Sequence, residues 1–379
     1  MTHFCRPHAE RTSYERAIRI GSNPLWKMVL CAGLHLSPTG AIAQLHDPTE
    51  SARIYVTREE RRKAGGEHRF TDWLVLSSLA EAEYVDERFR LRESRRRSTF
   101  DDLSKNLQLG LVATPTRWLK AELLYELDSD RSRTTSAIDE AIVSLERSSI
   151  SLDLGRMHLP FGVYISHFAT GPLLEFGDTR ADALVFSYEW QHRLELAGFV
   201  YSGRAHRIGG GGAPDFGLAL EYSPPLPLHF GMSVISDLAD SSARLLREQR
   251  DRYRKRVDAA SLYAIGGLGP FEASAEFVGA LRRFEELESN RARPRAWNVE
   301  LAWYPVEDVA VALRWETSRE LDDAPHRRSG IALSWRFLPS ASVTLDYLHA
   351  RFNRGFGHDA KERDARSVQQ ISAQLTVAF

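Results

Sequence analysis

The sequence contains little cysteine and no long hydrophobic run. Its only cysteines are Cys5 and Cys31, both before residue 44, so no disulfide or thiolate metal site is expected in the rest of the chain. No stretch approaches the roughly 18 consecutive apolar residues of a transmembrane helix. The mean hydropathy is −0.35. A helical membrane protein is therefore excluded.

An excess of charge of one sign is also missing. The chain has 50 Lys and Arg against 51 Asp and Glu, a formal charge of −1, which offers no case for nucleic acid as a partner. The sequence has no His-x-His or His-x-x-x-His pair for a metal ion and no Gly-x-Ser-x-Gly motif for a nucleophile. We therefore expect no cofactor, no direct metal site and no enzymatic activity.

The N-terminal region resembles a secretion signal. A short apolar segment runs from Met28 to Leu36, and Ala41-Ile42-Ala43 has the small-x-small pattern of a cleavage site. We expect residues 1–43 to be a cleaved signal or extension, 44–68 a short periplasmic leader, and 69–379 the folded domain. Met1 and Met28 both remain open as the translation start.

The last eleven residues, 369–379, alternate strictly between apolar and polar or small side chains. Ile371, Leu375 and Phe379 fall on the apolar face of this predicted strand. A final strand that ends on an aromatic residue resembles the assembly signal of bacterial outer-membrane β-barrels. We therefore expect the barrel-assembly machinery to recognise residues 369–379, and the chain to lie in the bacterial outer membrane.

Alternating segments repeat along the whole folded part, separated in turn by short and long connections. An even number of strands, with short turns at one end and long loops at the other, is typical of outer-membrane barrels. The sequence predicts an all-β fold, a sixteen-stranded antiparallel transmembrane β-barrel. The predicted strands are 73–85, 103–113, 118–127, 138–147, 150–157, 181–190, 192–202, 214–223, 226–237, 257–267, 270–284, 294–304, 307–318, 328–337, 341–352 and 367–379.

The polar face of these strands carries many ionisable side chains, which a water-filled channel tolerates and a dry core does not. Acidic residues dominate this face, which favours cations. The predicted outer loops 87–102 and 238–256 are instead rich in arginine. A funnel for an anionic solute and contact with lipopolysaccharide phosphates are both open explanations.

The third predicted outer loop, 158–180, is the one long loop that is largely apolar. An apolar loop avoids water, so we expect it to fold into the barrel and constrict the pore. Six residues are candidates for binding a solute there, four from the loop and two from the wall. They are Phe161, Glu175, Asp178, Arg180, Arg314 and Arg336.

This loop resembles the LbtU-type siderophore porins. The residues that carry the resemblance are Gly155, Pro160, Phe161, Gly162, Pro172, Leu173, Gly177, Asp178, Thr179 and Arg180. The resemblance implies an outer-membrane barrel that takes up a ferric siderophore. Members of that family can carry a longer periplasmic segment with coiled-coil character, and a function tied to that segment is not implied for this chain.

Other functions remain open beside siderophore uptake. A general diffusion porin of unknown selectivity would share the barrel and differ mainly at the third loop. An outer-membrane enzyme or a purely structural barrel is less favoured. The sequence offers no room for the plug domain of a TonB-dependent receptor. A homotrimer is one candidate assembly, and lipopolysaccharide and a small solute are the expected partners.

Overall fold

The computed structural model describes residues 68–93, 97–130, 134–203, 205, 214–246 and 253–379. The predicted signal segment, nearly all of the predicted leader, and both cysteines lie outside these ranges. In the described residues no helix is both long and apolar enough to cross a membrane. The structure instead consists of long strands joined into one antiparallel sheet.

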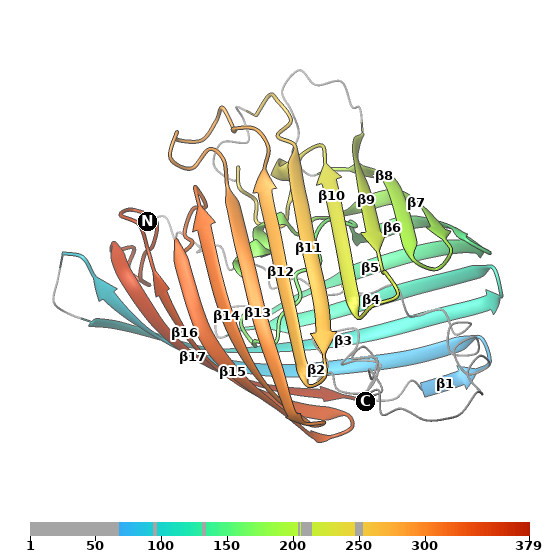
Figure 1. The fold of residues 1–379 in the computed structure, drawn as a ribbon, viewed down its shortest axis with the longest axis horizontal. Helices are drawn as coiled ribbons and strands as arrows, with labels where there is room; N and C mark the ends of the chain where they lie inside the picture. Colours follow the sequence, from blue (N-terminus) through green and yellow to red (C-terminus); the bar gives the residue numbers. More distant parts are fainter. Residues whose placement is uncertain (1–67, 94–96, 131–133, 204, 206–213, 247–252) are drawn as a thin grey trace, which may run out of the picture.

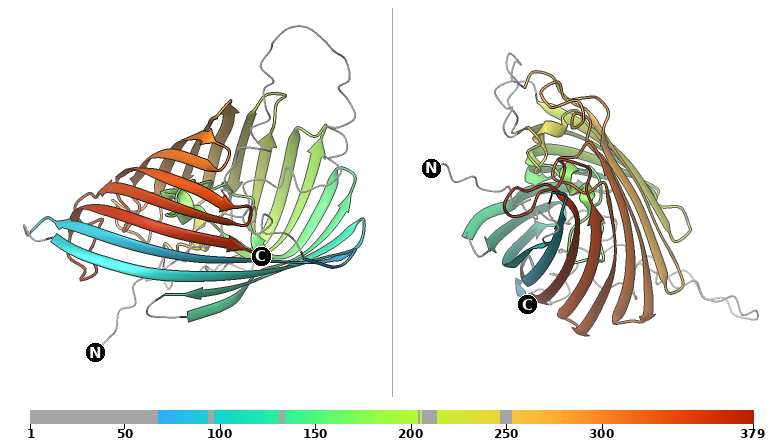
Figure 2. Two further views of the ribbon diagram at one scale, coloured as in Figure 1. Left: turned by 90° about the horizontal axis from the view of Figure 1, so that it is seen from below. Right: turned by 90° about the vertical axis from the view of Figure 1, so that its left-hand side faces the viewer.

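The strands follow one another around a closed ring (Figures 1 and 2). Each strand from β2 to β16 pairs with the next, and β17 pairs with β2. In the described part of the chain this gives the predicted closed sixteen-stranded barrel. Closure removes unpaired strand edges, which are costly in hydrocarbon. The strands are β1 His68–Thr71, β2 Leu74–Leu91, β3 Arg97–Thr116, β4 Leu119–Ser129, β5 Thr134–Arg147, β6 Ile150–His158, β7 Arg180–Trp190, β8 Leu194–Ser202, β9 Asp215–Tyr222, β10 Leu228–Ile235, β11 Ala259–Leu268, β12 Phe271–Ala280, β13 Arg295–Val306, β14 Val309–Arg319, β15 Arg327–Leu338, β16 Ala341–Arg351 and β17 Ala365–Ala378.

The C-terminal strand closes the ring at the predicted position. Ala378 lies opposite Leu79 of β2, and the Phe379 N–H donates to the Ser78 carbonyl at 3.1 Å. Strand β1 was not predicted. It pairs with residues 74–76 of β2, just beyond the end of the β17–β2 ladder, and so continues the pairing along that edge.

Two predicted outer loops are largely strand instead. Within 87–102, β2 continues to Leu91 and β3 begins at Arg97; within 128–137, β4 ends at Ser129 and β5 begins at Thr134. The physical reason in the first case is a small apolar cluster inside the barrel, where Phe89 and Leu91 pack with Phe352. Arginines assigned to a loop by sequence, Arg88, Arg90 and Arg97 among them, therefore lie on strands.

The two faces of the wall differ as the alternation predicts. Outward positions carry exposed aromatic and aliphatic side chains, such as Trp297 and Trp315, while the alternate positions Asn298 and Glu300 are buried inside. Two short 3₁₀ helices, η1 Leu173–Gly177 and η2 Leu238–Asp240, lie in the connections. The segment that contains η1 lies inside the ring of strands in both figures. This segment is the main functional candidate.

Candidate functional site

Residues 159–179, here called the inner loop, connect β6 to β7 and fold into the barrel as the sequence predicts. Their apolar side chains are almost fully buried: Leu159, Phe161, Val163, Ile165, Phe168, Leu174 and Phe176. Phe161 and Leu174 belong to the largest apolar cluster, together with Val278 of β12. The apolar character that makes this loop unusual among the long connections therefore places it against the inner wall.

Carboxylates of the wall hold the backbone of the inner loop. Glu276 of β12 accepts hydrogen bonds from the N–H groups of Val163 and Tyr164, at 2.8 and 2.9 Å. Glu300 of β13 accepts both the backbone N–H of His167 and its ring Nδ1, each at 3.0 Å. Bonds of this kind to a charged acceptor are roughly twice as strong as neutral ones.

The same arrangement continues on the next strands. Glu316 of β14 accepts from the Leu173 N–H at 2.6 Å, and Asp346 of β16 accepts from the Thr170 N–H at 3.1 Å. The Thr170 side chain also accepts a bond from Gln370 of β17 at 2.6 Å. The inner loop is thus fixed along one side of the lumen, from β12 to β17.

Two buried arginines complete this attachment. Arg314 donates to Glu300 at 2.8 Å and to the Thr170 carbonyl at 2.7 Å, and its guanidinium lies 4.1 Å from the centre of the Phe168 ring. Arg328 pairs with Glu316 and donates to the Gly171 carbonyl. Each buried charge has a partner of opposite sign, which offsets the cost of removing it from water.

A second ionic group fixes the ends of the inner loop. His158, the last residue of β6, contacts Asp178 through Nδ1 at 2.8 Å, and its Nε2 lies 3.7 Å from Asp139 of β5. Arg180, the first residue of β7, pairs with the same Asp139. The Asp178 carbonyl accepts from the Ser242 N–H at 2.7 Å, which connects the inner loop to the connection after β10.

The six predicted solute-binding residues fall into different environments. Phe161, Asp178, Arg180 and Arg314 are buried and engaged with the protein. Glu175 in η1 is partly exposed. Arg336 lies near the short-turn end of β15 and pairs with Asp308 at 2.7 Å, away from the attachments of the inner loop. Their role in solute binding stays a prediction.

Alternation correctly placed the residues that hold the inner loop on the polar face of the strands. Alternation did not predict that their hydrogen-bond partners are backbone groups of this loop. Glu276, Glu300, Glu316 and Asp346 lie more than a hundred residues along the chain from the groups they bind. No local sequence signal identifies such a pair. The sequence offered one indirect signal for this attachment. The inward faces of the strands carry many carboxylates, and a loop folded into the barrel has many backbone N–H groups that need an acceptor.

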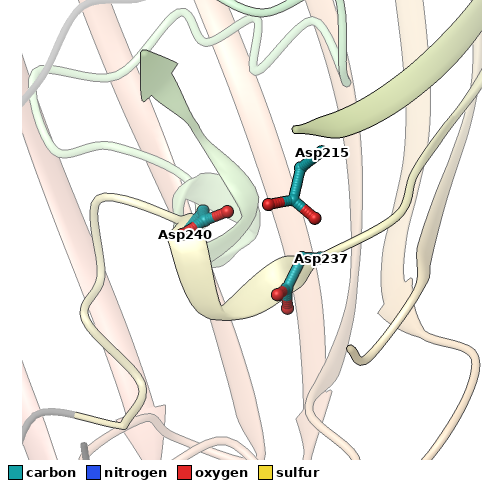
Figure 3. A group of neighbouring side chains, drawn as sticks. All are labelled: Asp215, Asp237 and Asp240. Carbon is teal, nitrogen blue, oxygen red and sulfur yellow. The ribbon is translucent and has the colours of Figure 1, made fainter. Parts of the chain in front are cut away.

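Three aspartates also meet at the outer end of the barrel, although no metal site was expected from the sequence (Figure 3). Asp215 pairs with Arg256 at 2.6 Å, Asp237 accepts from the Tyr253 hydroxyl, and Asp240 accepts from the Ala205 N–H at 2.7 Å. Burial raises the pKa of Asp237, while the Tyr253 bond opposes that rise. Donors from the protein thus tie the connections around β9, β10 and β11 together.

A further acidic group lies on the inner wall near the short turns. Glu189 of β7, Glu195 of β8 and Glu221 of β9 are direct neighbours in the ladder. The His192 ring donates through Nδ1 to Glu189 at 2.6 Å, and the His229 Nε2 lies 3.6 Å from Glu221. Carboxylates placed side by side make this part of the wall strongly negative.

Comparison with known proteins gives distant matches. No protein-family model matches the chain. A UPF0422 protein of Coxiella burnetii is 26% identical over 202 residues, which are 48% of this chain and 43% of that protein. A UPF0422 protein of Legionella pneumophila is 24% identical over 278 residues, 63% of this chain and 52% of that protein. The chain thus matches about half the length of these curated relatives.

Among solved structures the similar chains are outer-membrane porins. An anion-selective porin from Comamonas acidovorans superimposes with a TM-score of 0.58 at 11% identity, covering 81% of this chain and 100% of that one. The outer-membrane channel DcaP of Acinetobacter baumannii gives 0.57 at 10%, covering 82% and 99%. OmpF of Salmonella typhi gives 0.58 at 12%, covering 83% and 100%. The fold is therefore that of an outer-membrane porin, and the protein is located in the bacterial outer membrane.

Proposed function

We propose that this chain is an outer-membrane channel through which a small solute passes beside the inner loop. The observation that carries the proposal is the row of wall carboxylates that fixes that loop from β12 to β16. A loop held at so many points narrows the lumen at a constant place. The porin fold of the similar structures supports the same conclusion.

The charge of the remaining wall supports a preference for cationic or neutral solutes. Glu276, Glu300, Glu316 and Asp346 are engaged with the inner loop. Other inward carboxylates lie on β2, β4 and β7–β9, and this excess of negative charge attracts cations and repels anions. They are Glu81, Glu83, Glu122, Glu126, Glu189, Glu195 and Glu221.

We further propose a ferric siderophore as the solute, as the resemblance of residues 155–180 to LbtU-type siderophore porins implies. A chelated iron would enter without needing a protein ligand of its own. Glu175 is the predicted contact residue that keeps partial exposure in η1, so it is the first candidate to touch the solute. A general diffusion porin fits the fold equally well and is the second candidate.

Two assembly partners belong to the same proposal. Strand β17, which is followed by Phe379, closes the ring against β2, so recognition of residues 369–379 by the barrel-assembly machinery would precede closure. A homotrimer is the proposed assembly in the membrane. We propose no catalytic role for any residue.

Planar-bilayer conductance of the refolded protein tests this function. We expect stable channels that are blocked by micromolar ferric siderophore, and a weaker block in Glu175→Gln than in the control Glu122→Gln, which lies on β4 across the lumen. Channels that ignore every siderophore tried would leave the general diffusion porin. A correctly folded, heat-modifiable barrel without conductance would refute the channel itself.

A further inference from the structure

A row of arginines lies on the outer face of the barrel at the end with long connections. The row, here called the arginine rim, extends over neighbouring strands from β13 around the closure to β3. Its members alternate with buried inward residues along their strands, so their side chains point away from the lumen. They are Arg295, Arg319, Arg327, Arg351, Arg90 and Arg97.

The ladder places these arginines directly beside one another. Arg295 lies opposite Arg319, Arg327 opposite Arg351, and Arg90 opposite Arg97. Like charges in directly opposed positions destabilise a sheet.

The pairs are also linked around the wall. Ser367 of β17 lies opposite both Arg351 and Arg90, so it joins the second pair to the third. Thr317 of β14 lies opposite Arg327, which makes Arg319 and Arg327 diagonal neighbours. Strands lie about 4.8 Å apart, so the rim is one continuous strip of positive charge.

In the described residues no ion pair joins a member of the rim to a carboxylate. Ion pairs there engage nearby arginines, such as Arg88 with Asp86 and Arg92 with Asp364. An anion from outside the protein would stabilise a strip of arginines in opposed pairs.

The depth of the rim indicates which anion this is. Trp297 lies one outward position below Arg295, Trp315 lies two below Arg319, and Tyr347 lies two below Arg351. Aromatic side chains mark the level of the lipid headgroups in outer-membrane barrels. The rim is therefore at or just above the headgroups, on the lipid-facing side and not in the channel mouth.

The rest of the wall lacks this feature. On the described outward positions of β4–β12 at the same end, one arginine is present, Arg156, and it lies opposite Asp182. If these arginines only anchored the barrel at the membrane surface, they would be spread evenly around the ring of strands. Its concentration on one side indicates a specific site.

We propose that the arginine rim binds the phosphate groups of lipopolysaccharide in the outer leaflet. The planar guanidinium group presents paired donors that match phosphate oxygens, which is why arginine suits this ligand better than lysine. One phosphate between each opposed pair would turn a repulsive contact into two charge-assisted hydrogen-bonded contacts. Basic groups at membrane level are known to bind lipid headgroups in this way.

The test uses full-length protein in detergent with three probes: phosphorylated lipid A, dephosphorylated lipid A and inorganic phosphate. We expect phosphorylated lipid A to raise the unfolding midpoint, and the other two probes to leave it nearly unchanged. R327Q/R351Q and R295Q/R319Q should each bind phosphorylated lipid A at least about tenfold more weakly. The matched control is R156Q/R282Q, whose arginines lie beside Asp182 and Asp258 at the same end; it should bind like wild type.

Two further readouts separate a binding role from a structural one. Without lipid, the rim variants should be no less stable than wild type, because each removes a repulsive pair. Their conductance should be unchanged, so failure of this proposal is distinguishable from failure of the channel. Equal effects of phosphorylated and dephosphorylated lipid, equal loss in the control, full stabilisation by inorganic phosphate, or a changed oligomeric state in lipid-free variants would each overturn the proposal.

Discussion

Single carboxylates hold the inner loop because one glutamate can accept two backbone N–H groups at once. Glu276 does this for Val163 and Tyr164, which are adjacent in the chain. These N–H groups have no backbone carbonyl of a neighbouring strand to bind, because the inner loop forms no ladder with the wall. The carboxylate thus replaces the backbone partners that a strand would have offered.

Replacing Glu276 with glutamine should loosen this part of the inner loop. The amide keeps one acceptor oxygen but places an NH₂ group against a second N–H donor, at a cost of about 1–3 kcal/mol. We expect faster proteolysis within residues 162–168 and noisier single-channel currents, while the barrel still shows heat modifiability. Glu122→Gln, which alters a glutamate paired with Lys120, is the control. Identical proteolysis of both variants would contradict the anchoring role.

His326 reports the positive potential of the arginine rim. It lies in the connection between β14 and β15, and its pKa is lowered by burial and by the charges of Arg327, Arg351 and Arg92, against a hydrogen bond with the Arg351 backbone. Neutral histidine is favoured there, so the imidazole protonates only at lower pH than usual.

R327Q/R351Q should therefore raise the pKa of His326, since two neighbouring positive charges are removed. Bound phosphate should also raise the pKa of His326 in wild type, because its negative charge offsets the positive charge of the neighbouring arginines. The measurement is a pH titration of the histidine signals by NMR in detergent, with His326→Gln used to assign the signal. A pKa unchanged in the double variant would show that burial alone accounts for the shift.

At the scale of elements, β6 depends on one glycine. Gly155 has φ +133°, and a Cβ built there would lie 2.0 Å from the Ala141 carbonyl oxygen of β5. No side chain fits without moving the neighbouring backbone. Gly155 thus permits the close β5–β6 approach that leads into His158 and the inner loop.

Gly155→Ala should destabilise the barrel by at least about 1–3 kcal/mol, because both the backbone angle and the contact are unfavourable. The urea midpoint of refolding into detergent measures this. Gly198→Ala on β8 is the matched control. The nearest atom to its added Cβ would be in the Leu218 side chain, at an ordinary contact distance of 3.5 Å. Similar midpoints for the two variants would disprove the special role of Gly155.

Most elements were predictable from alternation, since a wall with lipid on one side and a polar lumen on the other imposes a period of two. The inward fold of the loop also followed, because its side chains are apolar. The anchors of the loop did not follow, because they pair across the barrel. The arginines on β2 and β3 were assigned to a loop because charged side chains at the membrane surface resemble loop residues. In the structure β2 and β3 stay paired there, and Phe89 and Phe100 pack on the inner side of this ladder.

At the scale of the whole molecule, charge is sorted between the two faces. The arginine rim is positive and faces lipid, while carboxylates dominate the lumen. Near the short turns, Glu189, Glu195 and Glu221 form a contiguous inward group. A solute that leaves the channel passes this group last, so it should influence which ions cross the membrane.

The reversal potential in a salt gradient should therefore show a preference for K⁺ over Cl⁻, and E195Q/E221Q should reduce it. Both glutamates oppose each other in the ladder, so neutralising the pair removes a concentrated negative charge from the inner wall. E285Q/E286Q, on the connection after β12 at the end with long connections, removes the same charge away from this inward group and should leave selectivity unchanged. The effect should shrink at molar salt, where the Debye length falls to about 3 Å. If both double variants shift the reversal potential equally, the general surface charge and not the inner wall sets the selectivity of the channel.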